Sequence, residues 1–357
     1  MSCGRGVPGA LGGGKEAGGV KRFARYIGRR AGWYLLTLFF ALLLNFYLPR
    51  LVPGDPISQI VSEIAAGGIE SDTMQRLYDP YVQEFGLDKP LPVQFVNYVW
   101  LLLQGDLGTS FSQYPTPVTT VLARALPWSL ALQLPALVVG WVVGNVLGAV
   151  AAYRKGIFDH TVFPLSLFLN SIPHYALGIL LLYFMAVVLD WFPVAGGYGQ
   201  SLSVAFTAPF LRSAAYHYVL PFLSIVLVTV GGQAIGMREM SIYELNSDYV
   251  LYCRSLGIGN LRIVSYVFKN AVLPQITGFA TSLGMVVGGS LITEVVFSYP
   301  GIGMELFTAI RQSDYPLIQG CTLLITLCVL GANFLMDLSY GLIDPRIRAA
   351  EMEEGAP

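Results

Sequence analysis

A phosphate-binding pattern is the first feature of the sequence that could do chemistry. Gly9 to Lys15 match GxxxxGK, the spacing that cradles nucleotide phosphates, but Glu16 stands where a Ser or Thr would hold magnesium. No strand-like pattern precedes this loop, so a chance match in a Gly-rich tail explains it better. HExxH, GxSxG and kinase motifs are absent from the sequence. We therefore expect no catalytic site in this chain, and no cofactor bound by it.

Potential metal ligands are scattered along the chain. The histidines and cysteines stand at His160, His174, His217, Cys3, Cys253, Cys321 and Cys328. The cysteines lack CxxC spacing and the histidines form no cluster, so neither a metal site nor a disulfide framework is expected. Two carboxylates, Glu294 and Asp337, fall within apolar stretches, where such groups can mark an ion path. We favour the alternative that they bond to neighbouring helices or reach an interface.

The elements that must position these residues are membrane helices. The chain has 357 residues, of which 54% are hydrophobic and 12% charged, and its mean hydropathy is +0.60. A soluble domain carries about 25% charged residues. Because about 20 helical residues cross the hydrocarbon, six stretches qualify as spans and predict an all-α membrane protein. They are Gly32 to Leu48, Pro127 to Ala152, Thr161 to Leu189, Tyr218 to Met237, Gln275 to Phe297 and Leu317 to Ile343.

The distribution of Lys and Arg predicts the orientation of these spans. Basic residues precede the first span and follow the sixth, whereas residues 50–126 contain four basic and eight acidic residues. The positive-inside rule therefore places both termini in the cytoplasm. The expected layout is a cytoplasmic tail (1–31), a first helix (32–49), a small extracytoplasmic domain (50–126), a core of five helices (127–344) and a second cytoplasmic tail (345–357). The first helix could be a cleaved signal peptide, but no small-residue cleavage site follows it.

A cytoplasmic segment between the fourth and fifth spans interrupts the apolar pattern. Two helical stretches, at about 241–256 and 261–272, are separated by a Gly-Ile-Gly-Asn turn that begins at Gly257. We expect Pro274 to start the fifth span. Tyrosines and basic residues alternate here, as they do at protein interfaces. Composition alone would equally allow a connecting loop that lies against lipid headgroups.

A series of motifs decides between these alternatives. In order they read GDLGTSF at 105–111, SIP at 171–173, DYVLYCRSLGIGN at 248–260, KNAVLPQIT at 269–277, EVVFSYPGIG at 294–303, SDYPLIQG at 313–320, NFLMD at 333–337 and LIDPRIR at 342–348. This series resembles the permease subunits of ATP-binding-cassette (ABC) importers of the dipeptide/oligopeptide/nickel group. The resemblance implies the type I importer architecture, a prokaryotic plasma membrane and a chain without its own ATPase.

The resemblance also implies partners and contact residues. They are a second homologous permease, two ABC ATPase subunits that use ATP and magnesium, and an extracytoplasmic substrate-binding protein; no nucleic acid is implied. By matching position, the contact with the ATPase would be made by Tyr249, Cys253, Arg254, Ser255 and Gly257. Cys253 and Ser255 replace the family's usual Ala, and Leu256 replaces a frequent Lys. The cytoplasmic pair of stretches would then be coupling helices.

Three functions remain as hypotheses. The first is the importer permease, which would move peptides, a nickel chelate or oligosaccharides. The second is a self-sufficient channel or secondary carrier, which would transport without ATP. The third is a membrane enzyme, for which the sequence offers no nucleophile, base or metal set.

Overall fold

The computed structural model describes residues 13–51, 82, 86–154, 156–284 and 291–343. Within those ranges every regular element is a helix, apart from one isolated bridge between Thr109 and Pro117. The expected terminal tails fall wholly or partly outside the described residues, as do much of the outer domain and the side chain of Asp337. Of the outer segment, α4 (Leu91–Leu103) and the turn that follows it are described.

Among the residues that the structure describes, four helices are long and apolar enough to cross a membrane. They are α1 (Gly13–Leu51), α5 (Val118–Arg154), α8 (Ala208–Leu245) and α13 (Tyr315–Ile343). Each includes one of the expected spans, so the all-helical membrane fold is confirmed. The helices extend beyond the expected apolar stretches into the flanking residues.

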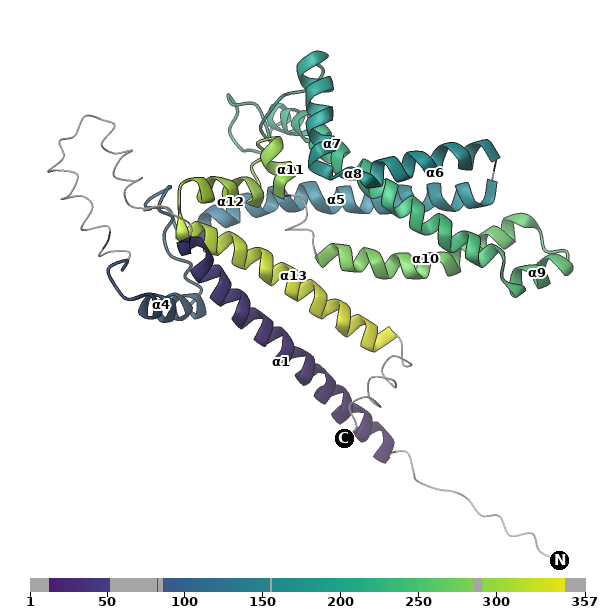
Figure 1. Ribbon diagram of the computed structural model, residues 1–357, viewed down its shortest axis with the longest axis horizontal. Coiled ribbons are helices and arrows are strands. Elements are labelled where there is room, and N and C mark those ends of the chain that lie inside the picture. The colour runs from purple at the N-terminus through teal and green to yellow at the C-terminus, as the bar shows by residue number, and fades with distance from the viewer. Residues whose placement is uncertain (1–12, 52–81, 83–85, 155, 285–290, 344–357) are drawn as a thin grey trace, which may run out of the picture.

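The third expected span is not one straight helix. It is divided into α6 (Gly156–Ser171), α7 (His174–Leu181) and a π-helical turn, η1 (Leu182–Val188), with a bend of 101° at the break. Figure 1 shows α7 rising away from α6. Pro173 explains the break, since it has no N–H to donate and disfavours helical backbone at Ile172.

The fifth expected span also differs. α10 (Asn260–Gly284) runs without interruption through Pro274, so the expectation that this proline starts a new helix is wrong. Ile263, Val267 and Ala271 are buried on α10 ahead of the proline, and this apolar packing outweighs the one backbone hydrogen bond that a proline removes. The rest of the expected span falls on residues 285–290, which lie outside the described ranges, and on α11 (Leu291–Val296).

Close packing of α5 on α8 forms the centre of the bundle. Gly140, Gly144 and Gly148 repeat at intervals of four on α5 and face α8. A Cβ atom at Gly144 would lie 2.6 Å from Cβ of Gln233 and 2.7 Å from the Val230 carbonyl oxygen. Small residues at this spacing let helix backbones approach closely in a membrane. Any side chain larger than Gly would separate the two helices.

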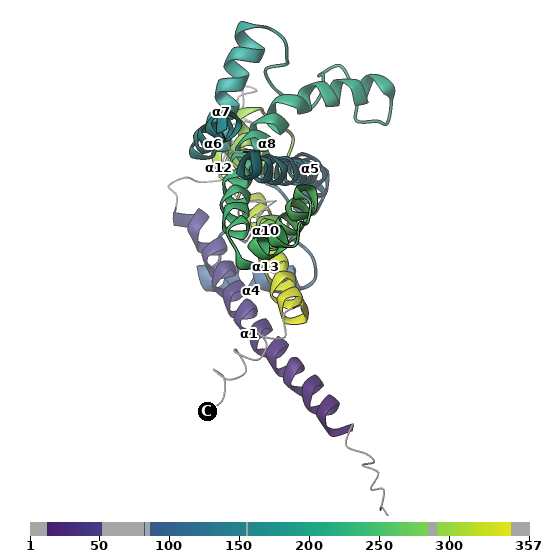
Figure 2. The ribbon, with the colours of Figure 1, turned by 90° about the vertical axis from the view of Figure 1, so that its right-hand side faces the viewer.

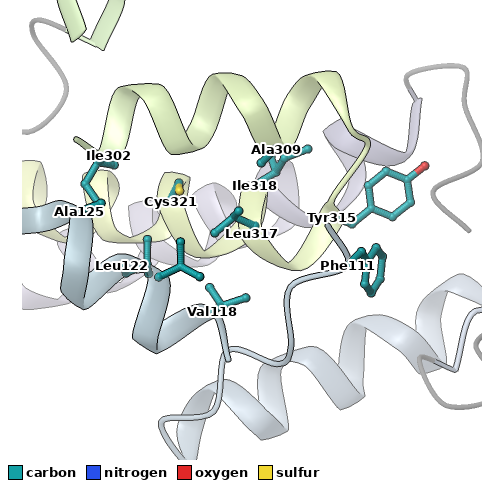
Figure 3. Close-up of a cluster of buried hydrophobic side chains, with 11 residues drawn as sticks. Phe111, Val118, Leu122, Ala125, Ile302, Ala309, Tyr315, Leu317, Ile318 and Cys321 are labelled. Atoms are coloured by element: carbon teal, nitrogen blue, oxygen red, sulfur yellow. The ribbon is translucent and has the colours of Figure 1, made fainter. Parts of the chain in front are cut away.

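A hydrophobic cluster joins α5 and α13 to a short helix at one end of the bundle. This short helix, α12 (Ile302–Arg311), lies between the fifth and sixth expected spans. Figure 3 shows side chains of α5, α12 and α13 converging, and the labelled members are Phe111, Val118, Leu122, Ala125, Ile302, Ala309, Tyr315, Leu317, Ile318 and Cys321. α1 lies along α13 beside this cluster, and only 6% of its apolar window is buried. That surface is therefore left for lipid or another subunit.

Candidate functional site

The segment predicted to be cytoplasmic forms an elbow at the end of α8. α8 ends at Leu245, α9 (Asp248–Ser255) follows after a short turn, and α10 begins at Asn260. The first of the two expected stretches is therefore divided between α8 and the eight-residue α9. α9 lies at the opposite end of the molecule from α11 and α12, and Figure 2 views the molecule from this end.

The Gly-Ile-Gly-Asn turn ends α9 with a Schellman motif. The N–H of Gly257 donates to the Arg254 carbonyl at 3.0 Å, and the N–H of Ile258 donates to the Cys253 carbonyl at 3.1 Å. Gly257 has φ +71°, in the left-handed region that favours glycine. A Cβ atom at Gly257 would meet nothing within 4 Å. The backbone conformation, rather than lack of space, therefore requires glycine here.

A small hydrophobic core holds α9 against the start of α10. Val250, Ile263 and Val267 are buried, and Cys253 and Ile258 pack against them. The contact between Cys253 and this core places the thiol side on the inner face of α9. α9 is thus held in place by this apolar packing as well as by the turns that connect it to α8 and α10.

Polar contacts join α8, α9 and α10 at the same place. The Tyr249 hydroxyl donates to the Glu244 carboxylate at 2.8 Å, and the Asn270 amide donates to the Tyr249 oxygen at 3.2 Å. Burial, together with the hydrogen bond to the Glu244 carboxylate, raises the pKa of Tyr249, so its hydroxyl stays protonated and keeps donating. Tyr249 of α9 is therefore hydrogen-bonded to both α8 and α10.

The five residues expected to contact an ATPase divide into two groups. Tyr249 and Cys253 are partly buried and face the elbow's own core, whereas Arg254, Ser255 and Gly257 are exposed.

Sequence reasoning left three exposed apolar side chains out of this set. The outer face of α9 also presents Leu251, Tyr252 and Leu256, which are 56%, 65% and 60% exposed. Leu251 and Tyr252 precede Ser255 by four and three positions, a helical spacing that could have identified them.

An ion pair lies two turns before the end of α8. Nε of Arg238 lies 2.5 Å from Oδ1 of Asp159, and Nη2 lies 2.7 Å from Oδ2. The guanidinium carbon also stands 4.2 Å from the ring centroid of Phe163. This two-point contact joins the start of α6 to α8 near the elbow.

Glu294 holds α12 in place. Its side chain is fully buried, and its carboxylate accepts hydrogen bonds from the Gly303 N–H at 2.7 Å and from Nε2 of Gln133 at 3.2 Å. The Ser129 hydroxyl accepts from the Ile302 N–H at 2.8 Å. The N–H groups of Ile302 and Gly303 are the first two of α12, where a negative charge is stabilising. Glu294 therefore bonds to neighbouring helices, as the sequence interpretation favoured.

A second buried carboxylate joins two distant motifs. Oδ2 of Asp314 accepts from the Ser110 hydroxyl at 2.6 Å, the Ser112 N–H at 2.9 Å and the Ser112 hydroxyl at 2.8 Å. Oδ1 accepts from the Leu317 N–H at 3.1 Å and so caps the start of α13. The GDLGTSF motif and the SDYPLIQG motif are thus two halves of one contact.

Comparison with known proteins gives the family of this chain. Residues 144–349 match the model of the family described as "Binding-protein-dependent transport system inner membrane component". A di/tripeptide transport system permease protein, DppB, from Pseudomonas aeruginosa is 33% identical over 339 residues, which cover 90% of this chain and 98% of the relative. A putative peptide permease from Brucella ovis is 35% identical, with 86% and 93% covered. The dipeptide transport system permease protein DppB from Escherichia coli is 31% identical, with 91% and 98% covered.

The chain therefore belongs to the family of binding-protein-dependent transport system inner membrane components. The resemblance inferred from the motif series is confirmed. Membership of this family makes the chain a multi-pass membrane protein and the permease component of an ABC importer.

Proposed function

We propose that this chain forms half of the translocation pathway of an ATP-driven importer for short peptides. Relatives named as dipeptide, di/tripeptide or peptide permeases, which match 86–91% of the chain, support this substrate class. A nickel chelate or an oligosaccharide remains the alternative cargo. The solute would be delivered by an extracytoplasmic binding protein, and the other half of the pathway would come from a second homologous permease.

In this proposal both termini lie in the cytoplasm of a prokaryotic cell, and six spans cross the plasma membrane. α1 forms the first span, and the broken unit of α6, α7 and η1 forms the third. The outer segment (50–126) and α12 face the binding protein's side. The core (127–344) provides the moving helices.

The energy would enter at the elbow. Two separate ATPase subunits bind ATP and magnesium, and one of them contacts α9 through Arg254, Ser255 and Gly257 together with Tyr252 and Leu256. Tyr249 and Cys253 act indirectly, because they hold α9 in position against α10. The chain itself needs no cofactor in this scheme.

One observation carries the coupling proposal. α9 is a short helix with a fixed inner face and an exposed outer face of aromatic, apolar and basic side chains. Aromatic residues and Arg are enriched at protein interfaces, whereas a mere connector has no need for a packed core and hydrogen bonds that join three helices. A helix held in this way can transmit a movement of the ATPase subunit to the bundle, whereas a loose loop cannot.

The motion would pass from α9 into the bundle. α8 receives it directly through the turn at Leu245, and α6 receives it through the ion pair between Asp159 and Arg238. Both helices lead toward the break at Pro173 in the middle of the third span. Closure of the two ATPases would then favour one of two arrangements of the helices, open inward or open outward.

Reconstitution tests this function directly. Proteoliposomes should contain the chain with its second permease, the ATPases and the binding protein, and a matched set should lack only the ATPases. We expect uptake of labelled dipeptide in the complete set, with both ATP and the loaded binding protein required. Uptake at the same rate without ATPases would instead establish a self-sufficient channel or carrier.

A further inference from the structure

A cavity lined by apolar side chains and several neutral polar ones lies at mid-depth between the central helices. It has a volume of about 480 Å³ and is bounded by α5, the break between α6 and α7, α8 and α10. The polar residues that line it are Gln133, Asn170, Ser171, His174, Thr229, Gln233 and Ser282. Ligand pockets for small molecules occupy about 300–1,000 Å³, so this volume suits a short peptide.

The position of the cavity along the helices gives its depth in the membrane. α8 has 38 residues, and the cavity is lined by Thr229 and Gln233 near its middle. At 1.5 Å per residue α8 spans about 57 Å, which exceeds the roughly 30 Å of hydrocarbon at both ends. The cavity therefore lies close to the centre of the bilayer, where polar side chains are costly unless they line a water-filled or ligand-filled space.

The chemistry of the lining is neutral and rich in amides. None of the described residues that line the cavity is Asp, Glu, Lys or Arg. Each Asn or Gln side chain offers one carbonyl acceptor and an NH₂ donor, the same groups that a peptide main chain presents in complementary form. A lining without formal charge cannot discriminate strongly between charged peptide side chains.

Two of these amides are held in place by neighbouring helices. Nε2 of Gln133 donates to Glu294, and Oε1 of Gln233 accepts from Nδ2 of Asn145 at 3.4 Å. A fixed side chain loses less conformational entropy when a ligand binds. Asn170 packs closely against α8 at Gly232, since a Cβ atom there would lie 2.8 Å from Oδ1 of Asn170. The cavity is thus preorganised rather than a gap left by poor packing.

We propose that this cavity binds the main chain of a short peptide during transport, through its amide side chains and without regard to the peptide's side chains. The inference rests on the proposed function, because it takes a peptide as the cargo. It assigns the passage site within this chain to α5, the break at Pro173, α8 and Ser282 of α10.

A filling variant with a matched control tests the site. Ser282→Trp places bulk in the cavity, and Ile276→Trp places the same bulk on α10 at a position that is 48% exposed and not part of the lining. Both variants are assembled into the complete reconstituted transporter. We expect Ser282→Trp to lower dipeptide uptake at least about tenfold, equivalent to about 1.4 kcal/mol. ATPase stimulation by the loaded binding protein should persist, and Ile276→Trp should transport normally.

A second variant tests recognition of the main chain. Asn170→Leu removes one exposed amide from the lining at similar size. Uptake of dialanine, dileucine and dilysine should fall by the same factor, about tenfold for one lost polar contact. A loss that depends on the peptide's side chains would overturn the proposal.

The outcomes separate this inference from the function beneath it. If the wild-type complex imports dipeptide and Ser282→Trp does so at the same rate, the cavity is not the passage site while the importer function stands. If Ser282→Trp also loses ATPase stimulation, its low uptake can come from a damaged complex. The uptake of the three dipeptides by Asn170→Leu, relative to wild type, then decides whether the cavity is the passage site. If the wild-type complex imports no dipeptide although its ATPase is stimulated, the peptide cargo and this inference both fail.

Discussion

The contact at Asp314 offers a quantitative prediction for the end of the bundle at which α12 lies. The side chain is fully buried and accepts four hydrogen bonds, three at Oδ2 and one at Oδ1. Asp314→Asn keeps the shape but replaces one acceptor oxygen by an NH₂ donor. If the remaining oxygen caps Leu317, the NH₂ group faces the Ser112 N–H; if the amide is turned, the cap is lost.

The expected cost follows from those two orientations. Either one leaves a buried backbone N–H without an acceptor, at about 1–3 kcal/mol, and weakens the remaining bonds because their acceptor is no longer charged. We expect a total loss of about 3 kcal/mol in the free energy of unfolding. Ser112→Ala removes only one hydroxyl donor and should cost about half as much.

Thermal unfolding in lipid nanodiscs measures this loss. The unfolding midpoint of Asp314→Asn should fall by about 5–10 °C, and that of Ser112→Ala by less. Asp190→Asn is the matched control, since Asp190 is exposed and Asn tolerates its positive φ of 53° equally well. An unchanged midpoint in Asp314→Asn would refute the reasoning that this carboxylate joins the two motifs.

Three further predictions concern the elbow, the ion pair and α12. Gly257→Ala should cost about 1–2 kcal/mol through its positive φ and lower transport-coupled ATPase activity, whereas Gly259→Ala in the same turn should be neutral; equal effects would exclude the backbone explanation. Asp159→Asn should raise the number of ATP molecules hydrolysed per peptide imported, and the exchange Asp159→Arg with Arg238→Asp should restore the wild-type number. A wild-type number in Asp159→Asn would contradict the connection to α6. Burial raises the pKa of Glu305, so its contribution to stability is full below the ordinary carboxyl pKa and falls as the pH rises through the raised value. Glu305→Gln should remove that fall at pH values above the ordinary carboxyl pKa, as unfolding midpoints measured across pH would show.

Sequence reasoning identified the elements that local chemistry specifies. Long apolar runs predicted the spans, and the glycine turn at Gly257 predicted the end of α9. The prolines show the limit of local rules, because Pro173 breaks a helix whereas Pro274 lies inside one. The difference depends on the packing that surrounds each proline, which one sequence does not contain.

The contacts that join distant residues were beyond sequence reasoning. Asp314 meets Ser110 across 204 positions, and Glu294 meets Gln133 across 161. Asp314, Ser110 and Glu294 each lie within a motif, but no spacing rule connects positions so far apart. The cavity was missed for the same reason, since its amides come from three different helices or breaks.

Cross-linking of α9 to an ATPase subunit tests the central claim most directly. In a background without native cysteines, Ser255→Cys provides a reactive thiol on the exposed face of α9, and Ser201→Cys provides an exposed control before α8, at the opposite end of that helix. A short bifunctional reagent applied to the assembled transporter should capture the ATPase through position 255, with a yield that changes when ATP binds, and should not capture it through position 201. Absence of an ATPase adduct at position 255 in a complex that imports peptide would contradict the claim that energy enters through this elbow.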